Sequence, residues 1–461
     1  MVLPLAVNFL YGEPHGTPFL LSIAVTASSG LLMLLLFPRA RRDLTHREGF
    51  AIVAFGWINA TFFGSLPYLF TGTLGSLADA CFEAASGFTT TGSTVFTQIE
   101  AASRAILFWR SFTQWLGGMG IILLSLAVLP YLGIGGMQLY RAEVPGPTAD
   151  KLRPRISQTA RLLWQVYLLF SAIEVLVLLL GGMNLFDALC HTFTTMATGG
   201  FSPKNAGIEF YRSPFLEFSI TFFMFVAGAN FALHYRFLKG DPGALWRDPE
   251  FRFYSWVMAG STLLITLNLY WISRLDLFQA FRQGLFQVVS IQTTTGYNSV
   301  DFEKWPAFSQ TVLLLLMFIG GCAGSTGGAI KCVRLLLLFK QGAQELLRLI
   351  HPRAVLPVKL GGKVVSPDTL YGIWGLFFLY LLIFAVGSLA LSLMGSDIVT
   401  SISAVATTLG NVGPGLGAVG PTDNFAHLPQ AAKWILIACM LLGRLEVYTL
   451  LVLFVPEFWR K

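Results

Sequence analysis

Long apolar segments alternate with short polar ones along the whole chain. Most of the apolar segments are about 20 residues long, which is the length of α-helix that crosses a bilayer. They cover residues 17–37, 50–70, 107–132, 162–182, 215–235, 255–273, 307–321, 370–395 and 433–456. Only 12% of the residues are charged, whereas soluble domains contain about 25%. The pattern therefore predicts an all-α, polytopic membrane protein.

A second pattern recurs between these segments. Four times, a short apolar stretch leads into a loop of threonine and glycine, and each such pair lies between two long apolar segments. The loops occupy residues 89–92, 196–199, 293–296 and 407–410. The chain therefore repeats a unit of helix, short helix, loop and helix, and we expect the four units to surround one central ion pore.

The short stretch before each loop opens at an aspartate, namely Asp79, Asp187, Asp276 or Asp397. Aspartate is a favoured N-cap residue, so we expect each one to begin a short helix. Such a helix points its C-terminus at the loop that follows it. The partial negative charge of a helix C-terminus favours a cation at that point.

Each threonine–glycine loop is expected at membrane depth. Non-helical backbone is tolerated there only where it is buried in protein or lines a watery path. One such loop alone is more typical of a helix cap or a packing contact. Four in equivalent settings favour a ring of backbone carbonyls, which can replace the water around a monovalent cation. The predicted ion-binding residues are Thr90, Thr91, Gly92, Ala197, Thr198, Gly199, Thr294, Thr295, Gly296, Thr408, Leu409, Gly410 and Asn411.

The net charge of +7 is unevenly distributed. Lysine and arginine concentrate in the connections between repeats, which the positive-inside rule places in the cytoplasm. All four loops then face the same side of the membrane, so the repeats are parallel. We divide the chain into an N-terminal transmembrane region with a cytoplasmic loop (1–49) and four pore repeats (50–150, 151–250, 251–366 and 367–461).

Other classes of function find little support in the sequence. The five cysteines form no CxxC or Cys/His cluster, so neither a disulfide framework nor a zinc site is predicted. His191 and His234 are not accompanied by an HExxH or GxSxG motif, which argues against an enzyme. A secondary transporter for a larger solute would have inverted repeats and charged residues at the membrane midplane. The parallel repeats and the scarcity of such charges argue against this class. No organic cofactor and no nucleic-acid partner are expected, because membrane topology explains the positive charge.

The third repeat contains a glycine-rich stretch over residues 320–328. Glycine inside a helix costs about 1 kcal/mol relative to alanine, so the helix is expected to unwind or kink there. Close helix packing through small residues is the alternative, and the absence of GxxxxGK[ST] excludes a phosphate loop. We interpret the stretch as a gate below the loops. The predicted gating residues are Gly320, Gly321, Gly324, Ser325, Thr326, Gly327, Gly328 and Lys331, together with Arg444 of the last apolar segment.

Charged residues also lie within apolar segments. Arg444 belongs to the last segment, and a charge at membrane depth usually faces the protein interior or a watery path. We expect Arg444 to line the pore or to form a structural ion pair, but not with Glu446, because residues two apart do not face each other on a helix. Glu83 is expected to bind backbone donors behind the first loop, and Arg110 to be interfacial or paired.

Six runs of residues carry a resemblance to a known family. They are REGF at 47–50, QWLGGMG at 114–120, GGMQLYRAE at 135–143, WRDPEFR at 246–252, the glycine-rich stretch at 320–328 and GRLEV at 443–447. With these runs the chain resembles the Trk-type potassium uptake proteins of the Trk/Ktr/HKT superfamily over nearly its whole length. The long members of that family have two helices before the first repeat, whereas residues 1–12 alone precede the first apolar segment here. A truncated first helix or a start further upstream is therefore expected.

The resemblance implies potassium and rubidium uptake through a selective, gated pore in the bacterial inner membrane, with K⁺ as the transported ion. It implies a homodimer among membrane lipids and a cytosolic, nucleotide-binding regulatory ring of the TrkA type. It assigns Gly92, Gly199, Gly296 and Gly410 to the selectivity filter, and Arg444 to the pore. In plant relatives, a serine at the first filter glycine accompanies sodium permeation. A Ktr-like, sodium-coupled potassium transporter is the alternative with the same fold.

Overall fold

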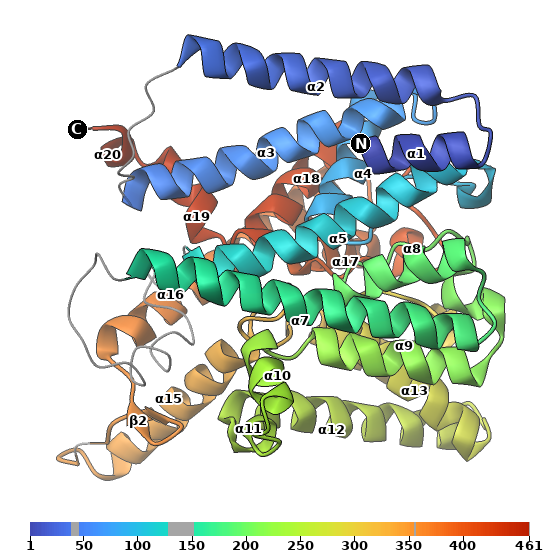
Figure 1. Ribbon diagram of the computed structural model, residues 1–461. Helices are drawn as coiled ribbons and strands as arrows, with labels where there is room; N and C mark the ends of the chain where they lie inside the picture. Colours follow the sequence, from blue (N-terminus) through green and yellow to red (C-terminus); the bar gives the residue numbers. More distant parts are fainter. Residues whose placement is uncertain (38–45, 128–151, 355, 461) are drawn as a thin grey trace.

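The computed structural model describes residues 1–37, 46–127, 152–354 and 356–460 (Figure 1). In this part of the chain the regular elements are helices, apart from one small hairpin of β1 (Lys359–Leu360) and β2 (Lys363–Val364). Five helices are long and apolar enough to cross a membrane, or up to seven if two bent pairs each count as one span. The predicted all-α, polytopic membrane fold is confirmed.

Four units of the same order follow one another along the chain. Each has a long helix, a short helix, a loop and a further helix. They consist of α3 (His46–Phe70), α4 (Leu77–Phe88) and α5 (Arg104–Ala127); α7 (Leu152–Leu180), α8 (Leu185–Met196) and α9 (Pro214–Ala227); α12 (Pro249–Ile272), α13 (Leu277–Gln292) and α14 (Ala307–Leu316); and α16 (Pro367–Leu393), α17 (Ile398–Gly410) and α18 (Gln430–Arg444).

The remaining helices connect or flank these units. They are α10 (Phe231–Leu238), α11 (Ala244–Arg247), α15 (Cys332–Ile350), α19 (Tyr448–Leu451) and α20 (Pro456–Trp459), with the 3-10 turns η1 (Ile99–Ala101), η3 (Gly207–Tyr211), η4 (Phe302–Lys304), η5 (Gly417–Val419) and η6 (Val452–Phe454). The resemblance motif at 135–143 lies outside the described residues.

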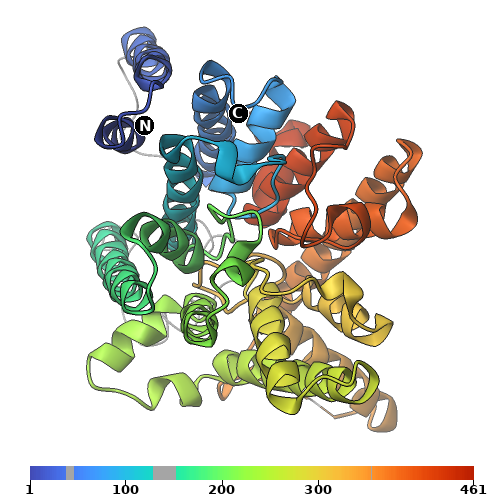
Figure 2. The same ribbon diagram turned by 90° about the vertical axis from the view of Figure 1, so that its right-hand side faces the viewer.

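The four units form a closed ring. Figure 2 shows them around a common centre, in sequence order from blue to red. Helix α5 packs on α8, α9 on α13, α15 on α16, and α18 returns to α4. The first and last units of the chain are therefore neighbours, and the four loops between short and long helices meet inside the ring.

The N-terminal residues form a helical hairpin outside this ring. Helix α1 (Val2–Leu10) packs on α5, and α2 (Gly16–Leu36) packs on α3 (Figure 1). In the turn between them, the Glu13 carboxylate accepts hydrogen bonds from the backbone N of Arg104 (2.7 Å) and of Ala105 (3.1 Å). Glu13 thereby caps the exposed N-terminus of α5, and a cap of this kind stabilises a helix by about 1 kcal/mol.

Two segments that we predicted as continuous spans are broken. The segment 215–235 divides into α9 and α10, which meet at 102°, and the segment 433–456 divides after α18 at 112°. Asn230 caps α10 through a 2.8 Å bond from the backbone N of Ala232. At the second break Val447 has a φ of +57°, which is strained for a β-branched side chain. Apolar composition alone could not reveal either break.

The short helices begin partly as predicted. Asp276 and Asp397 are the N-caps of α13 and α17. The prediction was wrong for Asp79 and Asp187, because the caps of α4 and α8 are Ser76 and Asn184, three residues earlier. The side chain of each cap accepts a bond from the backbone N of the aspartate and donates one to its carboxylate. This is a reciprocal arrangement like the capping box, in which the acid lies at the third helical position.

Candidate functional site

The four loops share one backbone conformation. In each, a non-glycine residue near the helix end has a left-handed φ, and a glycine with positive φ follows two residues later. The first positions are Thr90 (+52°), Thr198 (+53°), Thr294 (+61°) and Asn411 (+53°). The glycines are Gly92 (+87°), Gly200 (+75°), Gly296 (+79°) and Gly413 (+113°). Only glycine adopts such angles at low cost, so these four positions demand it.

Backbone hydrogen bonds give the same alignment of the loops. In each loop, the residue before the glycine donates its N–H to a carbonyl five residues back, in the last turn of the short helix. The pairs are Thr91 with Ser86 (2.8 Å), Gly199 with Thr194 (2.8 Å), Thr295 with Ser290 (2.9 Å) and Val412 with Thr407 (2.8 Å). These bonds give the same alignment of the four loops as the φ angles.

The predicted alignment of the second and fourth loops is therefore corrected. Gly199 is the equivalent of Thr91, and Gly410 is the last residue of α17, one residue before the left-handed Asn411. Matching the letters Thr-Gly misplaced the second loop by one residue and the fourth by three. In the second loop, two glycines follow Thr198, and the sequence alone does not show which of them is equivalent to Gly92. In the fourth loop, the left-handed residue is Asn411 and not a threonine, so the Thr-Gly pattern does not mark it.

The loops contact one another in a closed cycle. A Cβ atom added at Gly92 would overlap the carbonyl of Gly199 in the second loop, and one added at Gly413 would lie 2.9 Å from the carbonyl of Thr91. The same overlap joins Gly200 to Thr295 and Gly296 to Val412. Each loop therefore touches the next, and the fourth touches the first. No side chain fits at any of the four glycines without displacing a neighbouring loop.

Hydroxyl groups brace the loops. Thr89 and Thr91 share a hydrogen bond between their Oγ1 atoms at 2.7 Å, and Thr293 and Thr295 do the same at 2.8 Å. Between loops, Ser93 Oγ donates to the carbonyl of Gly413 (2.8 Å). Asn411 Nδ2 donates to Thr91 Oγ1 (3.0 Å). These bonds fix the first and fourth loops to each other.

Helix α5 holds the second loop through a glutamine. Gln114 Nε2 donates to the carbonyl of Gly199 (2.7 Å), and its Oε1 accepts from the backbone N of Phe201 (3.1 Å). Gln114 is completely buried. A side-chain amide that satisfies both a donor and an acceptor can fix a buried loop at one register. We did not predict this residue, although it lies within the QWLGGMG run.

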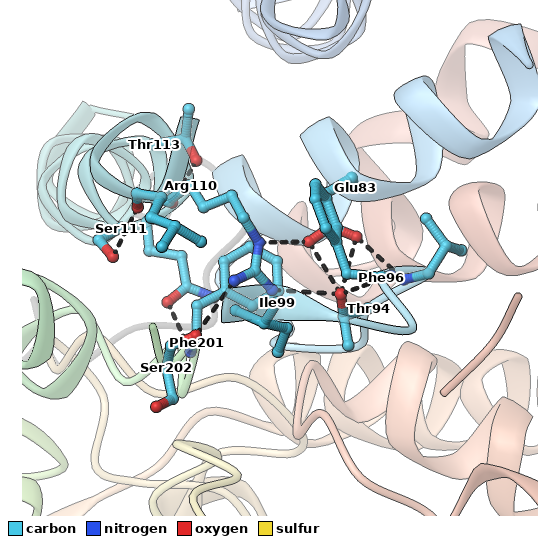
Figure 3. Close-up of polar contacts among 12 residues, drawn as sticks. Glu83, Thr94, Phe96, Ile99, Arg110, Ser111, Thr113, Phe201 and Ser202 are labelled. Carbon is cyan, nitrogen blue, oxygen red and sulfur yellow. Dashed lines mark hydrogen bonds and ion pairs between the residues drawn. The ribbon is translucent and has the colours of Figure 1, made fainter. Parts of the chain in front are cut away.

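Arg110, one turn before Gln114, joins the first loop to the second (Figure 3). Its Nε donates to Glu83 Oε1 (2.7 Å), Nη2 to Thr94 Oγ1 (3.1 Å) and Nη1 to the Ser202 carbonyl (3.1 Å). The guanidinium carbon also lies 4.1 Å from the ring centroid of Phe201, a cation–π contact. The arginine and the glutamate side chains are 1% and 0% exposed.

Glu83 is bound as we expected from its position behind the first loop. Its Oε2 accepts from the backbone N of Val95 (3.0 Å), and Thr94 Oγ1 donates to both carboxylate oxygens. Arg110 is paired rather than interfacial. Since breaking a buried pair leaves one charge uncompensated, we expect the loss of either residue alone to destabilise the contact between the two loops.

The glycine-rich stretch of the third unit is an irregular loop between α14 and α15. Its two arms are joined by bonds from the N of Gly320 to the carbonyl of Ile330 (2.9 Å) and from the N of Cys332 to the carbonyl of Gly321 (3.1 Å). The predicted interruption of the helix is confirmed. We call residues 320–331 the intramembrane loop.

The intramembrane loop reaches the threonine–glycine loops directly. The backbone N of Gly328 donates to Thr294 Oγ1 (2.6 Å), and Thr326 Oγ1 donates to the carbonyl of Met196 (3.0 Å). Lys331 bonds the carbonyl of Gly327 within the loop itself. Its ammonium group is buried. The loop is therefore packed against the second and third units of the ring.

Arg444 also contacts the intramembrane loop. Its Nη1 donates to the carbonyl of Thr326 (2.8 Å), and its Nη2 to the carbonyl of Gly117 (3.3 Å). As predicted, it does not pair with Glu446, which instead forms a buried ion pair with Arg334 of α15. Arg444 thus connects the end of α18 to the tip of the intramembrane loop.

Comparison with known proteins identifies the family. A family model described as TrkH, cation transport protein, matches residues 15–461. The Trk system potassium uptake protein TrkH of Salmonella typhimurium (strain LT2) is 45% identical over 465 residues, with 100% of this chain and 96% of that protein covered. The protein of the same name from Escherichia coli (strain K12) is also 45% identical, with the same coverage.

A solved structure agrees. The crystal structure of the potassium transporter TrkH from Vibrio parahaemolyticus superposes with a TM-score of 0.91 at 41% identity, over 100% of this chain and 96% of that chain. The chain is a multi-pass protein of the bacterial inner membrane and is a transport protein rather than an enzyme. Its sequence, its helices and its ring of loops show that it belongs to the TrkH family of cation transport proteins.

Proposed function

We propose that this chain takes up potassium and rubidium ions across the bacterial inner membrane through a selective, gated pore. The observation that carries the proposal is the closed cycle of four equivalent loops. All four share one backbone conformation, and none has space for a side chain at its glycine. The relatives named above are potassium uptake proteins and a potassium transporter. A ring of backbone carbonyls is the arrangement that replaces the hydration shell of K⁺ in known filters.

In the corrected alignment, the proposed filter consists of the left-handed residue, the next residue and the glycine of each loop. These are Thr90, Thr91 and Gly92; Thr198, Gly199 and Gly200; Thr294, Thr295 and Gly296; and Asn411, Val412 and Gly413. Of the residues predicted from the sequence, Ala197, Thr408, Leu409 and Gly410 belong to the helix ends instead. The helix C-termini that precede the loops supply partial negative charge toward a cation.

The proposed gate is the intramembrane loop with Lys331 and Arg444. The two cationic side chains are buried beside the loop, where a permeating cation would meet them. The driving force for uptake is the membrane potential, which is worth about 2.3 kcal/mol per elementary charge per 100 mV. We further propose a homodimer and control of the gate by a cytosolic nucleotide-binding ring acting on the basic cytoplasmic connections. Sodium-coupled potassium transport remains the alternative mechanism.

Flux measurements on the purified protein test the function. Proteoliposomes loaded with KCl are given external ⁸⁶Rb⁺ together with K⁺, Na⁺ or Li⁺. We expect Rb⁺ uptake that external K⁺ suppresses and that Na⁺ and Li⁺ leave unchanged. Uptake that requires Na⁺ would favour the sodium-coupled alternative. Absence of uptake, with and without the cytosolic ring, would contradict the proposal.

The gate has a separate test. A variant that lacks three residues of the segment 325–328 shortens the intramembrane loop, and we expect it to carry more Rb⁺ than the wild type in the absence of any partner. The matched control removes Gly361 and Gly362 from the turn between β1 and β2, which is far along the chain from the loop. Equal flux in all three proteins would reject the gate and leave the filter untouched.

A further inference from the structure

Glu250 is a buried acid that belongs to neither the filter nor the proposed gate. It lies in the first turn of α12, where its side chain is only 7% exposed. One carboxylate oxygen, Oε1, accepts two hydrogen bonds, from the backbone N of Ala323 (2.7 Å) and from that of Val333 (3.0 Å). The two donors lie ten residues apart, with Ala323 inside the intramembrane loop and Val333 in α15, directly after the arm that leads out of the loop.

The position of this oxygen explains how α15 begins. The N-cap of α15 is Lys331, whose side chain makes no capping bond, and the first turn contains no acid. Val333 is the second residue of that helix, so its N–H has no partner within the helix itself. Glu250 therefore acts as the missing cap from a different helix. A carboxylate at a helix N-terminus is also favoured by the helix dipole.

The other arm depends on the same oxygen. Ala323 follows Cys322, whose backbone N donates to the carbonyl of Gly228 (2.8 Å) at the break between α9 and α10. The bond from Ala323 to Glu250 thus fixes the arm that leads into the loop, while the bond from Val333 fixes the arm that leads out. Glu250 thus ties both arms to α12, in addition to the backbone bonds that join Gly320 to Ile330 and Cys332 to Gly321.

We propose that Glu250 is a positioning residue that closes the intramembrane loop by joining its two arms through one carboxylate oxygen. The inference rests on the proposed role of the loop as a gate. When the loop leaves the pathway, the two bonds to Glu250 are broken. Loss of two buried hydrogen bonds removes stabilisation from the closed loop and shifts the balance toward an open loop.

Two cysteines of the chain report directly on this closure. Cys322 and Cys332 lie beside the two bonded residues, and both are completely buried. Cys81, Cys190 and Cys439 are buried elsewhere and serve as internal references. We suggest labelling of the full-length protein in membranes with a hydrophilic maleimide, read out at each cysteine by peptide mass spectrometry, alongside ⁸⁶Rb⁺ flux without the partner.

For Glu250→Ala we expect labelling that rises at Cys322 and Cys332 only, with partner-free Rb⁺ flux about tenfold or more above wild type, the change that the loss of two ordinary hydrogen bonds can produce. Glu250→Gln keeps an acceptor oxygen and should restore most of the protection. Asp248→Ala is the matched control, because Asp248 caps α12 through the backbone N of Phe251 and, among the described residues, forms no hydrogen bond with the loop.

Two results would overturn the inference. One is wild-type labelling and flux in Glu250→Ala, which would show that the two bonds do not hold the arms. The other is an equal rise at all five cysteines, which would mean that Glu250 supports the whole fold rather than the loop. If shortening the loop leaves flux unchanged, the gate itself fails, whereas the labelling still decides whether Glu250 joins the arms.

Discussion

At the residue scale, the ring of loops depends on four glycines that have no space for a Cβ atom. Gly92, Gly200, Gly296 and Gly413 each place a hydrogen where any other residue would place a Cβ against the carbonyl of the next loop. A substitution there has two costs, the overlap and the positive φ, and strain of the second kind alone costs on the order of 1–3 kcal/mol. The ring can relieve the overlap only by widening, and a wider ring coordinates a small ion less selectively.

The fourth loop allows the corrected alignment to be tested. Gly413→Ser should lower the preference for K⁺ over Na⁺, because its Cβ would lie 2.9 Å from the Thr91 carbonyl. Gly410→Ala places a Cβ 2.7 Å from the carbonyl of Met317, outside the ring. It should lower the melting temperature while selectivity stays unchanged. Ion competition of ⁸⁶Rb⁺ uptake and thermal unfolding distinguish the two variants. Lower K⁺ selectivity in Gly410→Ala but not in Gly413→Ser would support Gly410 as the filter glycine of the fourth loop.

The buried pair of Arg110 and Glu83 makes a prediction about stability. Glu83→Gln leaves the guanidinium without its charge partner, and breaking a buried pair in this way typically costs about 3–5 kcal/mol. The double variant Glu83→Gln/Arg110→Gln should cost less than the sum of the single variants, because the two side chains contact each other. Denaturant unfolding in detergent measures this coupling. Additive losses would show that the two residues act independently.

At the scale of elements, the intramembrane loop is hydrogen-bonded to the third threonine–glycine loop. Gly328 donates its N–H to Thr294 Oγ1, so we expect movement of the intramembrane loop to displace the third threonine–glycine loop as well. Arg444 anchors the loop tip to α18, and the Arg334–Glu446 pair anchors α15 near the strained turn at Val447. Opening of the loop should therefore involve α15 and the break after α18 together.

The hydrogen bond between the intramembrane loop and the third threonine–glycine loop can be removed by one nearly isosteric substitution. Thr294→Val leaves the Gly328 N–H without its acceptor, and we expect higher Rb⁺ flux in the absence of a partner. Thr90→Val is the matched control, since Thr90 is the equivalent residue of the first loop and its hydroxyl has no partner among the described residues. Equal flux in both variants would show that the bond does not couple the two loops.

Element order could be predicted from the sequence, whereas the ends of the elements could be predicted only in part. Alternating apolar segments specify the four units because membrane helices must be apolar over a full span. The caps Ser76 and Asn184 were missed because the aspartates three residues later are also good caps. The breaks at Asn230 and Val447 depend on contacts with the intramembrane loop and α15, which are distant in sequence. Gln114 and Glu250 likewise act on segments far along the chain.

At the scale of the whole molecule, one chain builds a ring that closes on itself. Helix α18 returns to α4, and the fourth loop touches the first, so each unit supports its neighbours on two sides. The four loops are similar but not identical, with Asn411 in the fourth where the others have threonine. Among the described residues, the intramembrane loop belongs to the third unit, while the backbone of the ring keeps its four equivalent positions.

The central claim is that this ring of loops selects potassium. The most direct test is the reversal potential across a planar bilayer with K⁺ on one side and Na⁺ on the other, for the wild type and for Gly92→Ser. We predict a strong preference for K⁺ in the wild type and a reversal potential much closer to zero in Gly92→Ser, because the serine Cβ overlaps the Gly199 carbonyl. Identical, K⁺-selective reversal potentials for the two proteins would contradict the account.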